Sequence, residues 1–571
     1  MLSLVAMLGA FPAHAALQLH NAERHELDNG MTVILLPDRN FPVVSVQMLY
    51  TVGARSEVTG KTGLAHFLEH MAFRATKHFP DTDVVSRIYA RGGEWHGYTW
   101  TDQTTYFSTV PRDDLGLLLA IEADRMGRLE LDADFIEAER GAVLSEMHMY
   151  ENWPSSMLID ALLFTVFQAH PYRNNTIGWE SDIDNVTHED VVAFYRQHYQ
   201  PANAVLAIVG DFDKTAVRAQ IEALFGDFEK RPATPPPHTI EPVQQGERRV
   251  KVTGTTPGRR FVMGWRAPSA RHPDYAAFLV LQELLAGSSG VSFLQNDWGS
   301  PAKPGSVLYG ATEDITTWFP PSAQDYVFTV GGSINDSSSE ATAESAIDER
   351  LALFLESAPD PARVTAAVDE VRDELVFDVQ TTEDAAHQLA FFAGLDALDV
   401  LLTLPERLQS VTPDDVLRVA RHYLRPERRT IAWYRPGSSA DEPRAVEQVA
   451  IAIPATGTLD ETPAAAPVLK RLKGGVPAIV QASDLASSVE LRVVVPGNAL
   501  TTGDYAANDP EPGLLSFTGR ARPSEFAALA SQAGAALAEA THAAANFAPA
   551  STDPETRLHE EFRALMAPWG P

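Results

Sequence analysis

Two proline-rich segments interrupt the sequence, and they constrain the fold more than any other feature. The first, KRPATPPPHTIEPVQQGE, runs from Lys230 to Glu247, and the second covers residues 435–467. Proline fixes the backbone and lacks an amide donor, so both segments are expected to be extended linkers. Because 571 residues are also too many for one hydrophobic core, we expect three folded units, at residues 16–229, 248–434 and 468–571.

The first unit mixes strand and helix patterns without strict alternation. The runs MTVILLPD and VVSVQMLYTVG are rich in β-branched and apolar residues and end at turn-forming residues, as strands do. Apolar residues recur at helical spacing in DLGLLLAIEADRMGRL and in DFIEAERGAVLSEMHMYENW. This mixture predicts an α+β domain.

The third unit is expected to be a partial repeat of the first. KRLKGGVPAIVQASD, near Leu472, matches HELDNGMTVILLPD, near Leu27, and GLLSFTGR at residues 513–520 is matched with GLAHFLEH at residues 63–70. In this register the copy keeps the fold pattern and lacks two histidines and a glutamate of the first unit. The residues in their places are Ser516, Gly519 and Arg520.

The N-terminal run MLSLVAMLGAFPAHA is uncharged and apolar, and it ends in a small-x-small tripeptide typical of a signal-peptidase site. It is too short to span a bilayer, and no later stretch reaches about 18 consecutive apolar residues. We therefore expect residues 1–15 to be a signal peptide. The mature chain is expected in the periplasm or outside the cell, with no integral membrane segment.

Charge and cysteine content exclude several functions. The chain has 76 acidic and 45 basic residues, a net charge of −31, which argues against nucleic-acid partners because phosphate contacts need clustered Lys and Arg. No cysteine is present, so there are no disulfides, and any metal must be bound by His and carboxylates. Histidine-rich tracts typical of a zinc-storage module are also absent.

The stretch GLAHFLEHM is the strongest candidate for a metal site. On a helix, His66 and His70 lie one turn apart on one face, so their imidazoles can converge on one ion. Glu69 lies on the flank of that face, where it can reach a water beside the metal. A catalytic zinc needs a third protein ligand, which must here be Asp, Glu or His. The alternative is a solvated helix face that carries two histidines by chance.

A second segment, EAERGAVLSEMHMYE, places Glu139 and Glu146 seven residues apart, on one face of a helix. With it the sequence resembles the pitrilysin or insulinase family of zinc metallopeptidases, which carry an inverted H-x-x-E-H motif. In that family the third ligand is a glutamate about 76 residues beyond the second histidine, with another glutamate seven residues before it. This sequence has the same spacings, since Glu146 lies 76 residues after His70.

The resemblance implies one zinc ion per chain, held by His66, His70 and Glu146, with Glu69 as the general base and Glu139 supporting the ligands. It implies tandem homologous domains, each an antiparallel-rich sheet packed with helices, that close as a clamshell around a peptide chamber. The implied function is a metalloendopeptidase that hydrolyses peptides or unfolded protein fragments. The alternative is a non-catalytic subunit that holds substrate or has a structural role, although such subunits typically lose the motif that the first unit keeps.

The resemblance also suggests substrate contacts. GGEWHGYTWTDQTTY, residues 92–106, is similar to the family strand that pairs with an extended peptide, and His96 stands where the family usually has Asn. We favour His96 as a substrate contact or a polar strand residue over a fourth metal ligand. In the second unit, Tyr309 matches the family's substrate-binding tyrosine, but its segment lacks the family's arginine. Because this half diverges, we expect a partner subunit to complete the substrate site, either a second copy or a homologous subunit.

Overall fold

A computed structural model of the chain describes four short strands beyond residue 467 and residues 19–437, apart from 81–83, 288–289, 295–299 and 336. Residues Leu17–Val449 form one compact unit, and Met1–Ala16 with Ala450–Pro571 form the other. The expected signal peptide at residues 1–15, most of the linker at 435–467 and most of the third repeat lie outside the described residues. The unit boundaries read from the sequence therefore stay a prediction.

The larger unit begins with a six-stranded sheet in the order β1-β2-β6-β3-β5-β4. β2 and β6 run parallel, and the other neighbouring pairs are antiparallel. β3 and β6 are buried almost throughout because they lie in the middle of the sheet and consist mainly of apolar residues. The strands are β1 Glu23–Glu26, β2 Thr32–Pro37, β3 Val43–Tyr50, β4 Glu94–Thr99, β5 Thr104–Pro111 and β6 Ala204–Gly210.

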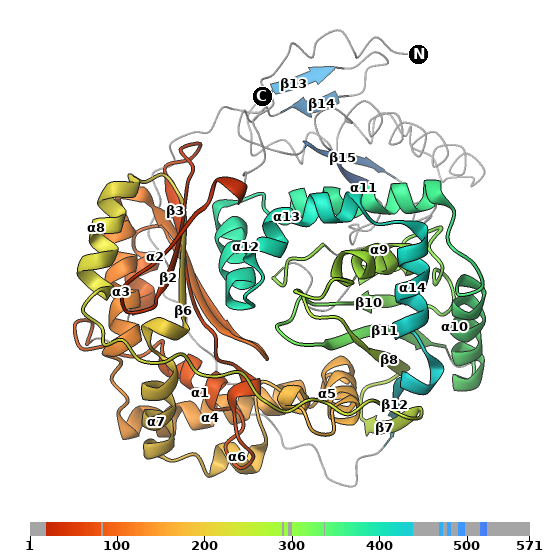
Figure 1. The fold of residues 1–571 in the computed structure, drawn as a ribbon, viewed down its shortest axis with the longest axis horizontal. Helices are drawn as coiled ribbons and strands as arrows, with labels where there is room; N and C mark the ends of the chain where they lie inside the picture. The colour runs from red at the N-terminus through yellow and green to blue at the C-terminus, as the bar shows by residue number, and fades with distance from the viewer. Residues whose placement is uncertain are drawn as a thin grey trace, which may run out of the picture. The chain divides into compact units, whose positions relative to one another are not determined.

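Helices cover both faces of this first sheet (Figure 1). In that view α2, α3 and α8 lie on one side of the sheet, and α12, Thr382–Gly394, lies on the other. A continuous hydrophobic cluster joins the first of these faces to α1, α3 and α8 through residues such as Met48, Phe67, Leu119 and Ile221. The helices of this half are α1 Leu64–Met71, α2 Val84–Tyr89, α3 Leu115–Gly127, α4 Ala133–Tyr150, α6 Glu180–Asp184, α7 His188–His198 and α8 Lys214–Phe225.

A second six-stranded sheet has the order β7-β12-β8-β11-β10-β9, and its first five strands repeat the order β2-β6-β3-β5-β4 of the first sheet. β7 and β12 form its parallel pair, as β2 and β6 do in the first sheet, and β8, β11 and β10 continue antiparallel as β3, β5 and β4 do. The α+β prediction is confirmed. The elements are β7 Arg248–Gly254, β8 Arg259–Ala267, α9 Tyr275–Leu285, β9 Ser300–Pro301, β10 Thr316–Trp318, β11 Tyr326–Ile334, α10 Glu340–Phe354, α11 Pro361–Phe377, α13 Leu398–Gln409, α14 Pro413–Tyr423 and β12 Thr430–Pro436.

The two halves exchange a helix. α5, Pro154–Val166, follows the first sheet's helices in sequence but packs on β7, β8 and β12, whereas α12, Thr382–Gly394, packs on β3, β5 and β6. Glycine makes both approaches close: a Cβ at Gly264 would lie 2.8 Å from Leu162, and one at Gly394 would lie 2.6 Å from Leu49. The second sheet's hydrophobic core therefore includes residues of both halves.

Residues 514–521 correct one expectation about the third unit. They form a strand, β16 Leu514–Ala521, paired antiparallel along its whole length with β15 Val489–Pro496. The register that matched GLLSFTGR with the helix at residues 63–70 is therefore wrong, because this run pairs as a strand. The hairpin of β13 Val468–Arg471 and β14 Pro477–Val480 does match the β1–β2 pairing, and β15–β16 has the sense of the β3–β5 pair.

Among the described residues, no single helix has the length and apolar content needed to cross a membrane. α12 and α13 pass that test only as a pair, which is bent by 105°.

Candidate metal centre

α1 is held at its N-terminus by a glycine and a buried carboxylate. Gly63 precedes the helix with φ of 83°, and a Cβ there would lie 2.4 Å from the carbonyl oxygen of Ile177, so no other residue fits without strain. The Glu57 carboxylate accepts hydrogen bonds from the amides of Gly63 and Ala65, each 2.8 Å long. These contacts fix the helix that carries the H-x-x-E-H motif.

α4 brings a carboxylate to the two histidines of α1. Its N-terminus is capped by Asp132, whose side chain accepts from the amide of Asp134. Oε2 of Glu146, near the other end of α4, lies 3.6 Å from Nε2 of His66 and 3.3 Å from Nε2 of His70. One ligand atom from each of these three side chains lies within 4.8 Å of the other two.

These three groups fit a zinc ion. Zinc bonds of about 2.0–2.1 Å in tetrahedral geometry put neighbouring ligand atoms roughly 3.3 Å apart, and the measured separations are 3.3 and 3.6 Å. Two imidazoles and one carboxylate are also a known catalytic zinc donor set. Burial lowers the pKa of His66 to about 4, which favours the neutral imidazole that binds a metal.

His70 is oriented by Glu139 and Arg74. Nδ1 of His70 lies 3.0 Å from Oε2 of Glu139, and Nε of Arg74 donates to Oε1 of Glu139 over 2.6 Å. Burial lowers the pKa of His70, but hydrogen bonds to Glu139 and Glu146 outweigh it and raise the pKa to about 9. For Glu139, burial acts to raise the pKa, but the hydrogen bonds with His70 and Arg74 outweigh it and bring the pKa below its ordinary value. The ring of His70 is thereby turned so that Nε2 faces Glu146.

Glu69 is buried beside the ligands. Burial raises its pKa to about 7, although a hydrogen bond from Thr99 acts in the opposite direction. Oγ1 of Thr99, the last residue of β4, donates to Oε2 of Glu69 over 2.7 Å. A carboxyl group with a pKa near neutrality is suited to accept and return a proton.

Sequence reasoning missed three of these supporting residues. Arg74 comes four residues after His70, just beyond the end of α1, and Tyr150 follows Glu146 by one turn of α4 and hydrogen-bonds to its carboxylate. Their i, i+4 spacing is a signal that could have identified both. Thr99 carries no such signal, because it reaches Glu69 only through the packing of β4 on α1.

His96 and Tyr309 lie apart from the ligands. Among the described residues, the group that could hold a metal is His66, His70 and Glu146, and it does not include His96. His96 is exposed on β4. No hydrogen bond or ion pair joins Tyr309 to the ligands in the described part of the chain. Its carbonyl instead accepts from Nη1 of Arg350 over 2.7 Å, so an arginine from α10 reaches this segment after all.

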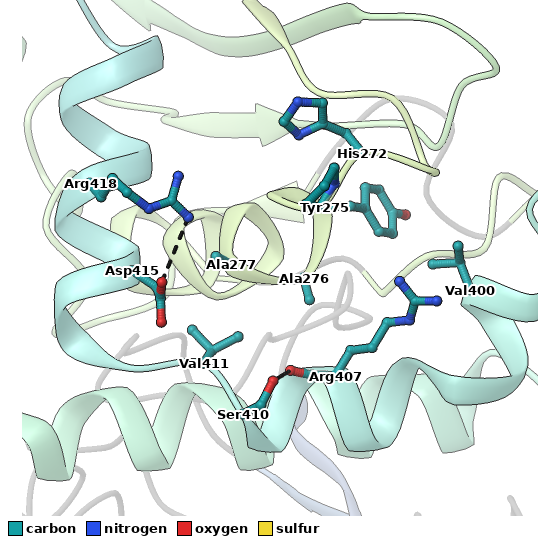
Figure 2. Close-up of a pocket in the computed structure, with 11 residues that line it drawn as sticks. His272, Tyr275, Ala276, Ala277, Val400, Arg407, Ser410, Val411, Asp415 and Arg418 are labelled. Atoms are coloured by element: carbon teal, nitrogen blue, oxygen red, sulfur yellow. Dashed lines mark hydrogen bonds and ion pairs between the residues drawn. The ribbon is translucent and has the colours of Figure 1, made fainter.

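A separate pocket of about 190 Å³ lies in the second half between α9, α13 and α14 (Figure 2). Two arginines line it. Arg418 is paired with Asp274 at 2.8 Å, and Arg407 donates to Thr403 over 2.8 Å. Because both guanidinium groups have partners within the protein, we assign this pocket no ligand.

Solved structures with the same fold define the class. A protease from Helicobacter pylori superposes with a TM-score of 0.67 at 25% sequence identity, covering 73% of this chain and 99% of that one. The first half of the periplasmic protease PqqL from Escherichia coli matches with a TM-score of 0.57 at 17% identity, covering 72% of this chain and 91% of that one. The fold is that of the two-domain M16-like peptidases.

Sequence comparison gives the family. Residues 32–179 match the model of insulinase (peptidase family M16), and residues 185–371 match that of the peptidase M16 inactive domain. The chain belongs to the insulinase family, peptidase family M16, and the resemblance inferred from the motif is confirmed. It is 29% identical over 447 residues to the zinc protease PqqE of Helicobacter pylori, an alignment that covers 76% of this chain and 97% of that protein.

Proposed function

We propose that the chain is a zinc-dependent endopeptidase that hydrolyses peptides or unfolded protein fragments. The observation that carries the proposal is the convergence of His66, His70 and Glu146, with ligand atoms within 4.8 Å of one another, beside the buried carboxyl group of Glu69. The similarity to a protein named zinc protease supports it. One zinc ion per chain is proposed.

The residues of the centre have distinct roles in this mechanism. A zinc ion held by His66, His70 and Glu146 would polarise the scissile carbonyl and activate a water. Glu69 takes a proton from the attacking water and returns it to the leaving amine. Thr99 holds the carboxylate of Glu69 through its 2.7 Å hydrogen bond during both transfers.

The substrate is proposed to bind as an extended strand along β4. Among the described strands, β4 pairs with β5 alone, so its other edge is available to a peptide backbone. β4 ends at Thr99, which contacts Glu69, so a peptide added there lies next to the reactive groups. Backbone pairing requires an extended chain, and we therefore propose unfolded segments within a chamber between the halves.

Two proposals concern the setting of the enzyme. We propose export to the periplasm or the cell exterior, on the strength of the apolar run at residues 1–15. We also propose assembly with a second copy or with a homologous subunit.

The alternative is a non-catalytic subunit that holds substrate. It is favoured by the match of residues 185–371 to an inactive-domain model. α9, which follows β8 as α1 follows β3, contains no histidine, so the second half has no equivalent of the metal-binding helix.

Zinc content and peptide hydrolysis separate the two functions. The purified, zinc-loaded chain is expected to bind one zinc ion and to cleave a quenched fluorescent peptide. Glu69→Gln should retain the zinc and lose about 10²–10⁴-fold in kcat, and the exposed Glu137→Gln should match the parent. Zinc-loaded parent protein without hydrolysis supports the subunit function, and a Glu69→Gln variant with parental turnover removes Glu69 from the proton transfer.

A further inference from the structure

One face of β4 is turned toward the metal centre. Trp95 and Thr99 lie on this face, four residues apart. The ring of Trp95 lies 4.0 Å from that of Phe73, just beyond α1, and Thr99 donates to Glu69. Side chains alternate along a strand, so His96 and Tyr98 point the other way.

The opposite face of β4 is turned toward α12, which comes from the second half. Glu94 is the cross-strand partner of Thr109, and Oγ1 of Thr109 donates to Glu383 of α12 over 2.7 Å. His96 and Tyr98 share this face because they follow Glu94 at intervals of two residues. A peptide strand paired with β4 therefore directs every second side chain toward His96 and Tyr98.

This second face carries a row of aromatic rings. The exposed ring of His96 lies over its cross-strand partner Phe107, with ring centres 5.2 Å apart and planes inclined by 30°. Tyr98 stacks on Phe293, with centres 5.3 Å apart and planes inclined by 27°. Tyr98 and Phe293 are only partly buried, so three rings are accessible.

The residues beneath Tyr98 are aromatic. Oη of Tyr98 lies 2.7 Å from Nε2 of the fully buried His387 on α12. Burial lowers the pKa of His387 to about 3, so its ring is neutral at physiological pH. The ring of His387 also lies 5.4 Å from that of Phe391. Residues of both halves therefore hold Tyr98 in place.

We propose that His96, Tyr98 and Phe293 form a subsite that selects peptides with an aromatic side chain on this face. The inference rests on the proposed peptidase function and adds its substrate class. Aromatic rings attract other rings at centre distances of about 4.5–7 Å, and a row of rings beside a peptide-binding edge offers that contact. The second half contributes to specificity here although it has no metal-binding helix.

The test is a set of alanine-serine peptides in which a single Phe is moved through successive positions. Mass spectrometry identifies the cleaved bond in each. His96 and Tyr98 lie two residues apart on β4. Cleavage is therefore expected to be fastest when Phe stands at every second peptide position counted from the cleaved bond. kcat/KM at those positions should exceed that at the intervening one by about tenfold. Equal rates at every position overturn the proposal.

Variants assign the selection to the rings. His96→Ala should reduce the ratio of kcat/KM between the Phe peptide and the matching alanine peptide about 3- to 10-fold, and His96→Phe should restore it. Glu94→Gln, on the same face but without a ring, should leave the ratio unchanged. Zinc content measured in all variants excludes loss of the metal. A ratio unaffected by His96→Ala contradicts the subsite.

Binding separates failure of the subsite from failure of the proposed function. In the Glu69→Gln background, the Phe peptide is expected to bind about tenfold more tightly than the alanine peptide. Adding His96→Ala should remove that difference. Preferential binding without hydrolysis by the parent supports the subsite and contradicts the peptidase function. Hydrolysis by the parent without any preference in rate or binding supports the peptidase function and contradicts the subsite.

Discussion

Replacing Glu139 by Gln tests how strongly the metal centre depends on a residue that does not touch the metal. Glu139 accepts two charge-assisted hydrogen bonds, from His70 and from Arg74, at 3.0 and 2.6 Å. The single amide oxygen of Gln can keep only one of them at full strength. Losing one such bond costs about 1.5–3 kcal/mol. Zinc affinity is therefore expected to fall roughly 10- to 100-fold.

The assay is competition for zinc between the protein and a chelating dye. Glu137→Gln is the matched control, because Glu137 lies on the same helix, is largely exposed and forms its ion pair with Arg140, at 3.1 Å. Thermal unfolding of both metal-free variants shows whether the fold is retained. If Glu139→Gln binds zinc as tightly as Glu137→Gln does, Glu139 does not orient His70 and the reasoning is wrong.

Three further predictions follow from the same region. Zinc affinity should rise with pH, up to about tenfold per unit between about pH 6 and about pH 9. The reason is that the metal must displace the proton of His70, whose pKa is about 9. Equal zinc affinities across that interval, measured by dye competition, refute this prediction. Gly63→Ala should cost at least about 1–3 kcal/mol of unfolding free energy, and more than Gly60→Ala. Both glycines have φ near 85°, but of the two only Gly63 has a backbone oxygen 2.4 Å from the added Cβ. Denaturant unfolding that ranks the two variants in the other order contradicts this prediction. Thr99→Val should lower kcat about tenfold without loss of zinc, since it removes one hydrogen bond to the carboxylate of Glu69, whereas parental turnover shows that Thr99 does not position that group.

The motif residues could be predicted because helix geometry is local. His66 and His70 must share a face of α1, so their convergence follows from sequence spacing. Glu146 needed the family resemblance, because nothing in the sequence places α4 against α1. Thr99 was missed for the same reason: a strand and a helix meet there through tertiary packing.

The exchange of α5 and α12 could not be read from the sequence. Apolar spacing can indicate that a segment is helical, but it does not specify the sheet on which the helix packs. The helical register given to GLLSFTGR failed in a related way. A short apolar run is compatible with a helix or a strand. This run forms a strand because it pairs with β15, which its own residues do not reveal.

The exchanged helices give the chain the character of a domain swap within a single polypeptide. A protease that cut the linker at residues 230–247 would leave α5 on the N-terminal fragment and α12 on the C-terminal one, each still buried in the other fragment's sheet. The pieces would remain together as a nicked, folded protein. Expressing either half alone would instead leave one sheet face without its helix, exposing a large apolar surface to water. The halves are therefore joined by the packing of α5 and α12 as well as by the linker.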